Sequence, residues 1–224
     1  MSEQLIFDLP ARSAFGRDDF FVSPANALAL QGVDNWRDWP LGRAVLVGAA
    51  GCGKTHLAHV WQSETGARVI DAKNMSALLS GDFANIACLV VEDIDRLAGQ
   101  IEAERALFHL VNMAQAQDVH LLMTSATAPA RLDIGLADLK SRLEATQLVA
   151  MEAPDDALLS ALLIKQFSDR QLLVNPAVIT YMLGRMERSA RSAQALVSVL
   201  DRQALAQKRA ITRAMAGEVL DKLG

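Results

Sequence analysis

The run VLVGAAGCGKTHLAH, which spans Val45–His59, decides the fold of this chain. Within it, residues 48–55 match the spacing G-x-x-x-x-G-K-[ST] of a phosphate-binding loop. The apolar residues at 44–47 indicate a buried strand before the loop, and residues 55–63 have the pattern of a helix after it. Because the motif lies between a strand and a helix, as phosphate binding requires, we predict a nucleotide site here.

Each residue type in this loop has a physical task. Glycines allow the backbone amides to turn toward a polyphosphate. Lys54 is long enough for the β- and γ-phosphates, Thr55 can ligate Mg²⁺, and the start of the following helix favours an anion. The residues assigned to ADP or ATP in this loop are Gly48, Gly51, Gly53, Lys54, Thr55 and His56.

The composition bounds the class of protein. A chain of 224 residues that is 51% hydrophobic can bury a large core with a smaller appendage. Its net charge of −4 gives no global support for a nucleic-acid surface. The first residues carry no positive leader and no apolar run is long enough for a membrane helix, so we expect a soluble cytoplasmic protein. Cys52 and Cys88 are too few for a disulfide framework, and Cys52 is interpreted as a small loop filler.

Strand and helix patterns alternate along the first two thirds of the chain. The expected strands are 44–47, 67–71, 86–92, 119–125 and 147–151. The expected helices are 25–36, 55–63, 74–80, 102–117 and 137–143. This alternation predicts an α/β fold with a five-stranded parallel sheet covered by helices on both faces. Ligands of such sheets bind at the carboxyl ends of the strands.

Two acidic residues end the third expected strand. Glu92 and Asp93 follow an apolar run, where one acid can lie near a metal and the other can orient water. We therefore assign Glu92 to Mg²⁺ and both residues to catalysis, and we expect Asp95 to be solvated. Phe21 and Val22 precede the loop and are candidates to cover a nucleotide base, with packing into the core as the alternative.

Only helical periodicity follows Pro154. Asp155, Asn175 with Pro176, Ser189 and Thr212 are good helix starts. We therefore divide the chain into an N-terminal arm at 1–20, a nucleotide-binding core at 21–153 and a small all-α lid at 154–224.

The N-terminal arm carries an alternating apolar peptide. Leu5, Phe7 and Leu9 share one side of an extended chain, and Gln4 offers a hydrogen-bond donor and acceptor. This pattern is typical of a peptide that binds an apolar groove of another protein. Folding back onto its own domain is the alternative.

Two longer matches carry a family resemblance. The run GKTHLAH at 53–59 and the run FVSPAN at 21–26 resemble the DnaA-related AAA+ family, over residues 15–224. The resemblance implies a P-loop AAA+ core with a helical lid. In the initiator a DNA-binding helix-turn-helix domain follows the lid, whereas this chain stops at Gly224. With the arm included, the chain resembles the Hda family of DnaA regulatory inactivators.

The resemblance implies roles for further residues. In that family a peptide matching Gln4, Leu5, Phe7 and Leu9 binds the replicative sliding clamp. Arg142 corresponds to the arginine finger, which acts on the nucleotide of a neighbouring subunit. Arg188 corresponds best to the sensor-2 arginine, with Arg191 as the alternative.

Two departures from the family pattern affect hydrolysis. Glu92 stands where the family usually has aspartate, and Ala126 stands where the initiator carries an acidic sensor. Because Ala126 cannot orient a water molecule, intrinsic ATP hydrolysis is expected to be weak or absent.

The resulting hypothesis is a negative regulator of replication initiation. It binds ADP or ATP with Mg²⁺, docks on the sliding clamp and stimulates ATP hydrolysis by DnaA, and it forms a homodimer or larger oligomer. It binds neither a membrane nor a specific DNA sequence. The alternatives are a self-sufficient AAA+ ATPase of the helicase-loading or remodelling type and a DNA-binding paralogue of the initiator.

Overall fold

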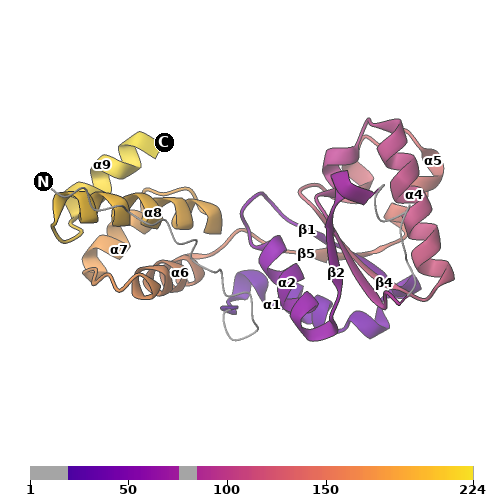
Figure 1. Cartoon of the computed structure of the whole chain (residues 1–224), viewed down its shortest axis with the longest axis horizontal. Helices are drawn as coiled ribbons and strands as arrows, with labels where there is room; N and C mark the ends of the chain where they lie inside the picture. The colour runs from indigo at the N-terminus through magenta and orange to yellow at the C-terminus, as the bar shows by residue number, and fades with distance from the viewer. Residues whose placement is uncertain (1–19, 76–84, 224) are drawn as a thin grey trace, which may run out of the picture.

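The computed structural model of the chain describes residues 20–75 and 85–223 (Figure 1). The predicted arm residues Gln4, Leu5, Phe7 and Leu9 lie outside these ranges, as does most of the helix expected at 74–80. Figure 1 shows a sheet with helices on both faces, joined to a separate group of helices at its side.

Five parallel strands form the sheet in the described part of the chain, in the order β2-β3-β4-β1-β5. Their bounds are β1 (Arg43–Val47), β2 (Arg68–Asp71), β3 (Cys88–Glu92), β4 (His120–Ser125) and β5 (Gln147–Ala150). The three middle strands are almost wholly buried because both faces are covered. The prediction of a five-stranded parallel α/β fold is confirmed.

Successive side chains of each strand enter two different cores. In β1, Ala44 and Leu46 pack with α1 (Pro24–Asp34) and α2 (Lys54–Thr65). Val45 points to the other face, where α4 (Ile101–Ala116) and α5 (Ala137–Glu144) lie. Figure 1 shows α4 and α5 on the side of the sheet away from α1, α2 and the separate helices.

Short 3₁₀ turns connect these elements. They are η2 (Trp36–Asp38), η3 (Pro40–Gly42), η4 (Ala72–Asn74), η5 (Ile94–Leu97) and η6 (Pro129–Arg131). The turn η5 directly follows the strand that ends in Glu92, so it continues the acidic edge of the sheet.

The four C-terminal helices have their own apolar core. They are α6 (Asp156–Asp169), α7 (Pro176–Leu183), α8 (Ala190–Gln207) and α9 (Arg213–Leu223), and we call them the lid. Side chains that were expected to start helices do cap them: Asp155 accepts from Leu158 N at 2.7 Å, and Ser189 from Ser192 N at 3.0 Å. Such caps satisfy amides that a helix leaves unpaired, which is why the starts are readable in the sequence.

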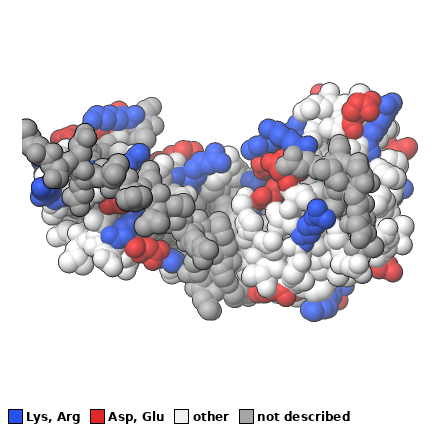
Figure 2. All heavy atoms as spheres, viewed as in Figure 1, with Lys and Arg blue, Asp and Glu red and all other residues white. Residues whose placement is uncertain are grey.

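On the face drawn in Figure 2, the described Lys and Arg residues are interspersed with Asp and Glu and form no continuous basic stripe. None of the helices in the described ranges has the length and apolarity needed to cross a membrane.

Candidate functional site: the phosphate-binding loop and its surroundings

The glycine-rich loop leaves the carboxyl end of β1 and enters α2. Gly48 N donates to Ser125 O at 3.2 Å, which holds the start of the loop beside the end of β4. Gly53 caps α2 with φ at 113°, a backbone conformation that a side chain would strain. The loop therefore has the strand-turn-helix context of a phosphate cradle, with the α2 amides at its base.

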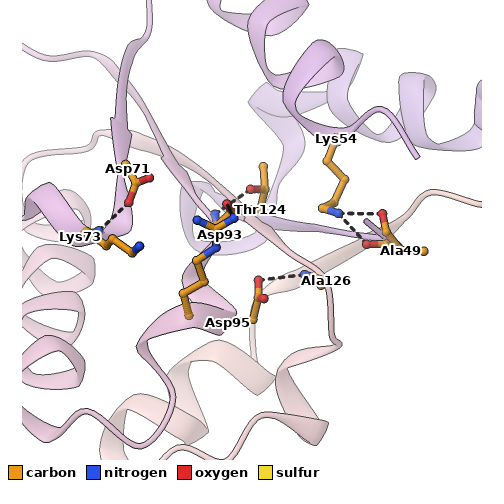
Figure 3. Close-up of polar contacts among 10 residues, drawn as sticks. Ala49, Lys54, Asp71, Lys73, Asp93, Asp95, Thr124 and Ala126 are labelled. Atoms are coloured by element: carbon orange, nitrogen blue, oxygen red, sulfur yellow. Dashed lines mark hydrogen bonds and ion pairs between the residues drawn. The ribbon is translucent and has the colours of Figure 1, made fainter. Parts of the chain in front are cut away.

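Lys54 is folded into this loop. Its side chain is buried, and Nζ donates to Gly48 O at 2.6 Å and to Ala49 O at 3.0 Å (Figure 3). The ammonium is thus held among carbonyl oxygens at the turn, where a phosphate oxygen could replace them as its partner. Thr55, the next residue, is exposed and so remains accessible for a metal ion.

Glu92 and Asp93 lie at the neighbouring edge of the sheet. Glu92 Oε1 is buried and has no hydrogen-bond partner among the described residues. Asp93 adopts φ of 59°, its amide donates to Thr124 Oγ1 at 2.9 Å, and its carboxylate pairs with Arg96 at 2.8 Å. An unsatisfied buried oxygen is costly, so Glu92 suits a bound cation or its water.

These residues fit a nucleotide with Mg²⁺. No group of three or more His, Cys, Asp or Glu residues able to hold a metal ion occurs in the described ranges. Mg²⁺ in nucleotide sites is commonly held by one or two carboxylates with phosphates and water. Thr55 and Glu92 would hold it here, and the metal would neutralise phosphate charge.

Asp95 is partly exposed, and it also makes a hydrogen bond within the protein. Its Oδ1 accepts from Ala126 N at 2.9 Å, which brings a carboxylate to the end of β4 next to the loop (Figure 3). The two residues are 31 positions apart, and no sequence signal marks the contact. An acid from η5 therefore lies at the strand end where Ala126 itself has no polar side chain.

A small hollow lies beside the loop, between α2 and the lid. Its volume is about 50 Å³, and its lining includes Phe21, His56, Met151 and Leu158. Phe20 also lines it and stacks edge-on against His56 with centroids 5.3 Å apart, whereas Val22 is 59% exposed and is not part of the lining. Since one water occupies roughly 30 Å³, a nucleotide base can enter only if the lining side chains move.

The lid touches the loop directly through the start of α8. Ala190 N donates to Gly51 O at 2.9 Å. A Cβ on Gly51, whose φ is 75°, would lie 2.7 Å from Ser189 Cβ and 3.5 Å from Arg191 Cβ. The glycine thus permits the lid to approach.

Arg188 and Arg191, the two candidates for the sensor-2 arginine, differ in their distance from this contact between the lid and the loop. The Cβ of Arg191 lies near the loop, because it would be 3.5 Å from a Cβ built on Gly51. Arg188 points to the start of α6, where it pairs with Asp156 at 2.8 Å between two exposed side chains. The family resemblance favoured Arg188, and the sensor-2 role of either arginine stays a prediction.

Arg142 is not part of this site. It lies on α5, and its guanidinium is 5.2 Å from the centre of the Phe108 ring on α4. Its carbonyl accepts from the buried Arg43 at 3.5 Å. Burial, followed by the charge of Arg142, lowers the pKa of Arg43. Arg43 begins β1 and the loop follows the end of that strand, so Arg142 lies near the opposite end of β1 from the phosphate-binding loop, against α4.

Cys52 fills space beneath the loop. It is buried, and burial raises the pKa of its thiol, although the nearby Lys54 opposes this shift. A neutral thiol at pH 7 is a poor nucleophile, which agrees with the interpretation of Cys52 as a loop filler.

Comparisons with solved structures identify the fold. The chain matches domain III of the Thermotoga maritima replication initiation protein DnaA with a TM-score of 0.79 and 19% identity, over 96% of this chain and 98% of that one. AMPPCP-bound DnaA from Aquifex aeolicus matches with a TM-score of 0.68 and 22% identity, over 85% of this chain and 66% of that one. The Thermotoga maritima RuvB Holliday junction branch migration motor gives 0.62 and 20%, over 81% and 61%.

No protein-family model matches the chain. Identities of 19–22% to these structures show that the chain shares their α/β fold. Within that fold, the structure brings the loop, Glu92, Asp93, Phe21 and His56 around one edge of the sheet. It keeps Arg142 apart.

Proposed function

We propose that this chain is a nucleotide-bound AAA+ regulator of replication initiation, of the kind found in the Hda family. Residues 4–9 of the arm bind the sliding clamp. The clamp-bound chain then presents Arg142 to the ATP site of DnaA and accelerates hydrolysis there, which inactivates the initiator.

The observation that carries this proposal is the position of Arg142. Its guanidinium lies over Phe108, on the face formed by α4 and α5, while Lys54 and the base hollow lie on the α1 and α2 side. An arginine beside the first residue of β1 is far from the nucleotide of its own chain, which would lie at the other end of that strand. A role in trans suits it, because an arginine supplied by a partner can neutralise charge in phosphoryl transfer.

The experiment is ATP hydrolysis by purified DnaA with this protein added, with and without DNA-loaded clamp. Wild-type protein should stimulate hydrolysis only when the clamp is present. Arg142→Ala should lower the stimulated rate by about 10³-fold or more. Arg105→Ala, which removes another α4–α5 face arginine in an exposed ion pair with Glu102, is the matched control and should retain full stimulation.

Two further measurements locate the defect. Arg142→Ala should bind clamp and nucleotide as tightly as wild type, because the substitution leaves residues 4–9 unchanged and Arg142 packs on Phe108 of α4, away from the loop. Replacing Gln4, Leu5 and Leu9 by Ala should remove clamp binding and leave nucleotide binding unchanged. Full stimulation by Arg142→Ala would refute the proposal.

A self-sufficient ATPase is the second candidate. The buried oxygen of Glu92 without a partner and the bond from Asp95 to Ala126 N favour it, because they supply acids at the nucleotide edge. This second function would be identified by steady ATP turnover by this chain alone, and Glu92→Gln should abolish that turnover. If such turnover occurs and DnaA is not stimulated, this second function replaces the first.

A further inference from the structure

The helix that carries Arg142 is tied to α4 by a buried carboxylate. Glu104 is fully buried, and its Oε2 accepts from Leu136 N at 2.9 Å. Leu136 is the residue that precedes α5, so this bond fixes the start of the helix. A buried carboxylate is tolerated only when hydrogen bonds compensate for lost hydration, and here they come from backbone amides.

The other oxygen of Glu104 is bonded to a different segment. Oε1 accepts from Gly99 N at 2.9 Å, in the turn after η5. The stretch of chain that ends at Gly99 begins with Asp93 and Asp95, at the edge of the sheet beside the phosphate-binding loop. Glu104 therefore joins the turn before α4 to the start of the Arg142 helix: the Gly99 bond closes the start of α4 itself, and the Leu136 bond reaches a different helix.

One turn further along α4, Phe108 lies under the guanidinium of Arg142. Residues four apart share one side of a helix, so Glu104 and Phe108 both face α5. The ring centre is 5.2 Å from Arg142 Cζ, within the range of a cation–π contact. One face of α4 therefore holds the start of α5 through Glu104 and the guanidinium of Arg142, near the end of α5, through Phe108.

We propose that Glu104 and Phe108 are positioning residues for Arg142. The inference rests on the proposed function, in which Arg142 acts on a partner's nucleotide. Glu104 sets the position of α5 relative to the core, and Phe108 limits the orientations of the guanidinium before the partner binds. A preset position matters because displacement of a catalytic group by about 1 Å can reduce a rate by about 100-fold.

The test compares Glu104→Gln with Glu102→Gln in the DnaA hydrolysis assay with loaded clamp. Glutamine keeps the shape but offers one acceptor oxygen, so one of the two amides loses its partner. Glu102 lies on the same turn, is exposed and pairs only with Arg105 in the described structure, which makes it the matched control. Glu104→Gln should lower the maximal stimulated rate by between about 10-fold and 100-fold, and Glu102→Gln should not.

The concentration of regulator that gives half-maximal stimulation separates positioning from docking or folding. It should be unchanged in Glu104→Gln, as should the affinity for ADP, because neither the arm nor the loop is altered. Phe108→Leu keeps apolar bulk but removes the ring face, and it should likewise lower only the maximal rate. This second variant tests the inference independently if Glu104→Gln does not fold.

The Arg142→Ala background completes the test. If both residues act through Arg142, neither change should reduce stimulation further in that background. Full maximal rates for Glu104→Gln and Phe108→Leu, beside a defective Arg142→Ala, would overturn this inference alone. A fully active Arg142→Ala would instead overturn the proposed function.

Discussion

The two faces of the sheet are built in different ways. The nucleotide side takes its loop, its lysine and Thr55, one of its two metal-binding candidates, from one continuous run, Gly48–Thr55, and the lid closes against it. The Arg142 side depends on contacts between distant segments, since Arg43 reaches the carbonyl of Arg142 across 99 positions and Glu104 reaches Leu136 across 32. Because the sheet separates the two, binding of the chain's own nucleotide and action on a partner can be altered independently.

The largest effect on the nucleotide side is expected from Lys54→Ala. Removing one member of a buried charged pair costs about 2–5 kcal/mol, so affinity for ADP or ATP should fall between about 30-fold and 5,000-fold. Isothermal titration measures the change. Lys73→Ala is the matched control, because Lys73 is an exposed residue of η4 beside Asp71 and away from the loop (Figure 3).

Clamp binding by Lys54→Ala is the measurement that checks the separation. It should equal that of wild type, because the substitution leaves residues 4–9 unchanged. Undiminished nucleotide affinity in Lys54→Ala would contradict the assignment of the site. Equal loss of clamp and nucleotide binding would contradict the separation.

Local sequence signals predicted most of the fold. The strand ending in Glu92 was expected at 86–92 and is found at Cys88–Glu92, and the helix expected at 102–117 is Ile101–Ala116. These elements are readable because buried parallel strands are continuous apolar runs and because helix starts carry capping side chains. The observed ends of these elements differ from the expected ends by one or two residues, because the last residues of a helix or strand lack part of its regular hydrogen bonding.

The site was predictable only where it is contiguous. Lys54 and Thr55 could be predicted because the spacing of the phosphate-binding motif determines where these two residues lie in the loop. The bond from Asp95 to Ala126 N and the placement of Glu104 require knowing which turns meet across the sheet, and no pattern within one segment encodes this. The same holds for Arg191, whose position beside the loop depends on how the lid docks through the bond from Ala190 N to Gly51 O.

A smaller effect should distinguish Arg191 from Arg188. A charge-assisted hydrogen bond to phosphate contributes about 1.5–3 kcal/mol, so Arg191→Ala should weaken nucleotide binding by about 10-fold or more. Arg188→Ala breaks an exposed pair with Asp156, whose typical contribution is about 0–1 kcal/mol, and should leave nucleotide affinity unchanged. The reverse order in a binding titration would show that the docking of the lid in solution differs from the contact with Gly51.

The smallest expected effect concerns Asp155, where the chain passes from the sheet to the lid. Its carboxylate caps α6, and the hydrogen bond from Leu158 N is the main reason that its pKa lies below the ordinary value. Loss of such a cap costs about 1 kcal/mol. Asp155→Ala should therefore lower the melting temperature by about 2–4 °C at pH 7.

The lowered pKa of Asp155 determines how the effect of Asp155→Ala on stability changes with pH. A carboxyl group whose pKa is lowered by folding stabilises the fold fully above its unfolded pKa of about 3.9, and this contribution disappears as the pH falls through the folded value. The difference between wild type and Asp155→Ala should thus be constant from pH 7 to about pH 5 and shrink below about pH 4. Asp169→Ala, which removes an exposed partner of Lys165, should change stability by less than about 0.5 kcal/mol. A melting difference for Asp155→Ala that stays the same down to pH 3 would mean that packing of the side chain, rather than its charged cap, holds the lid to the core.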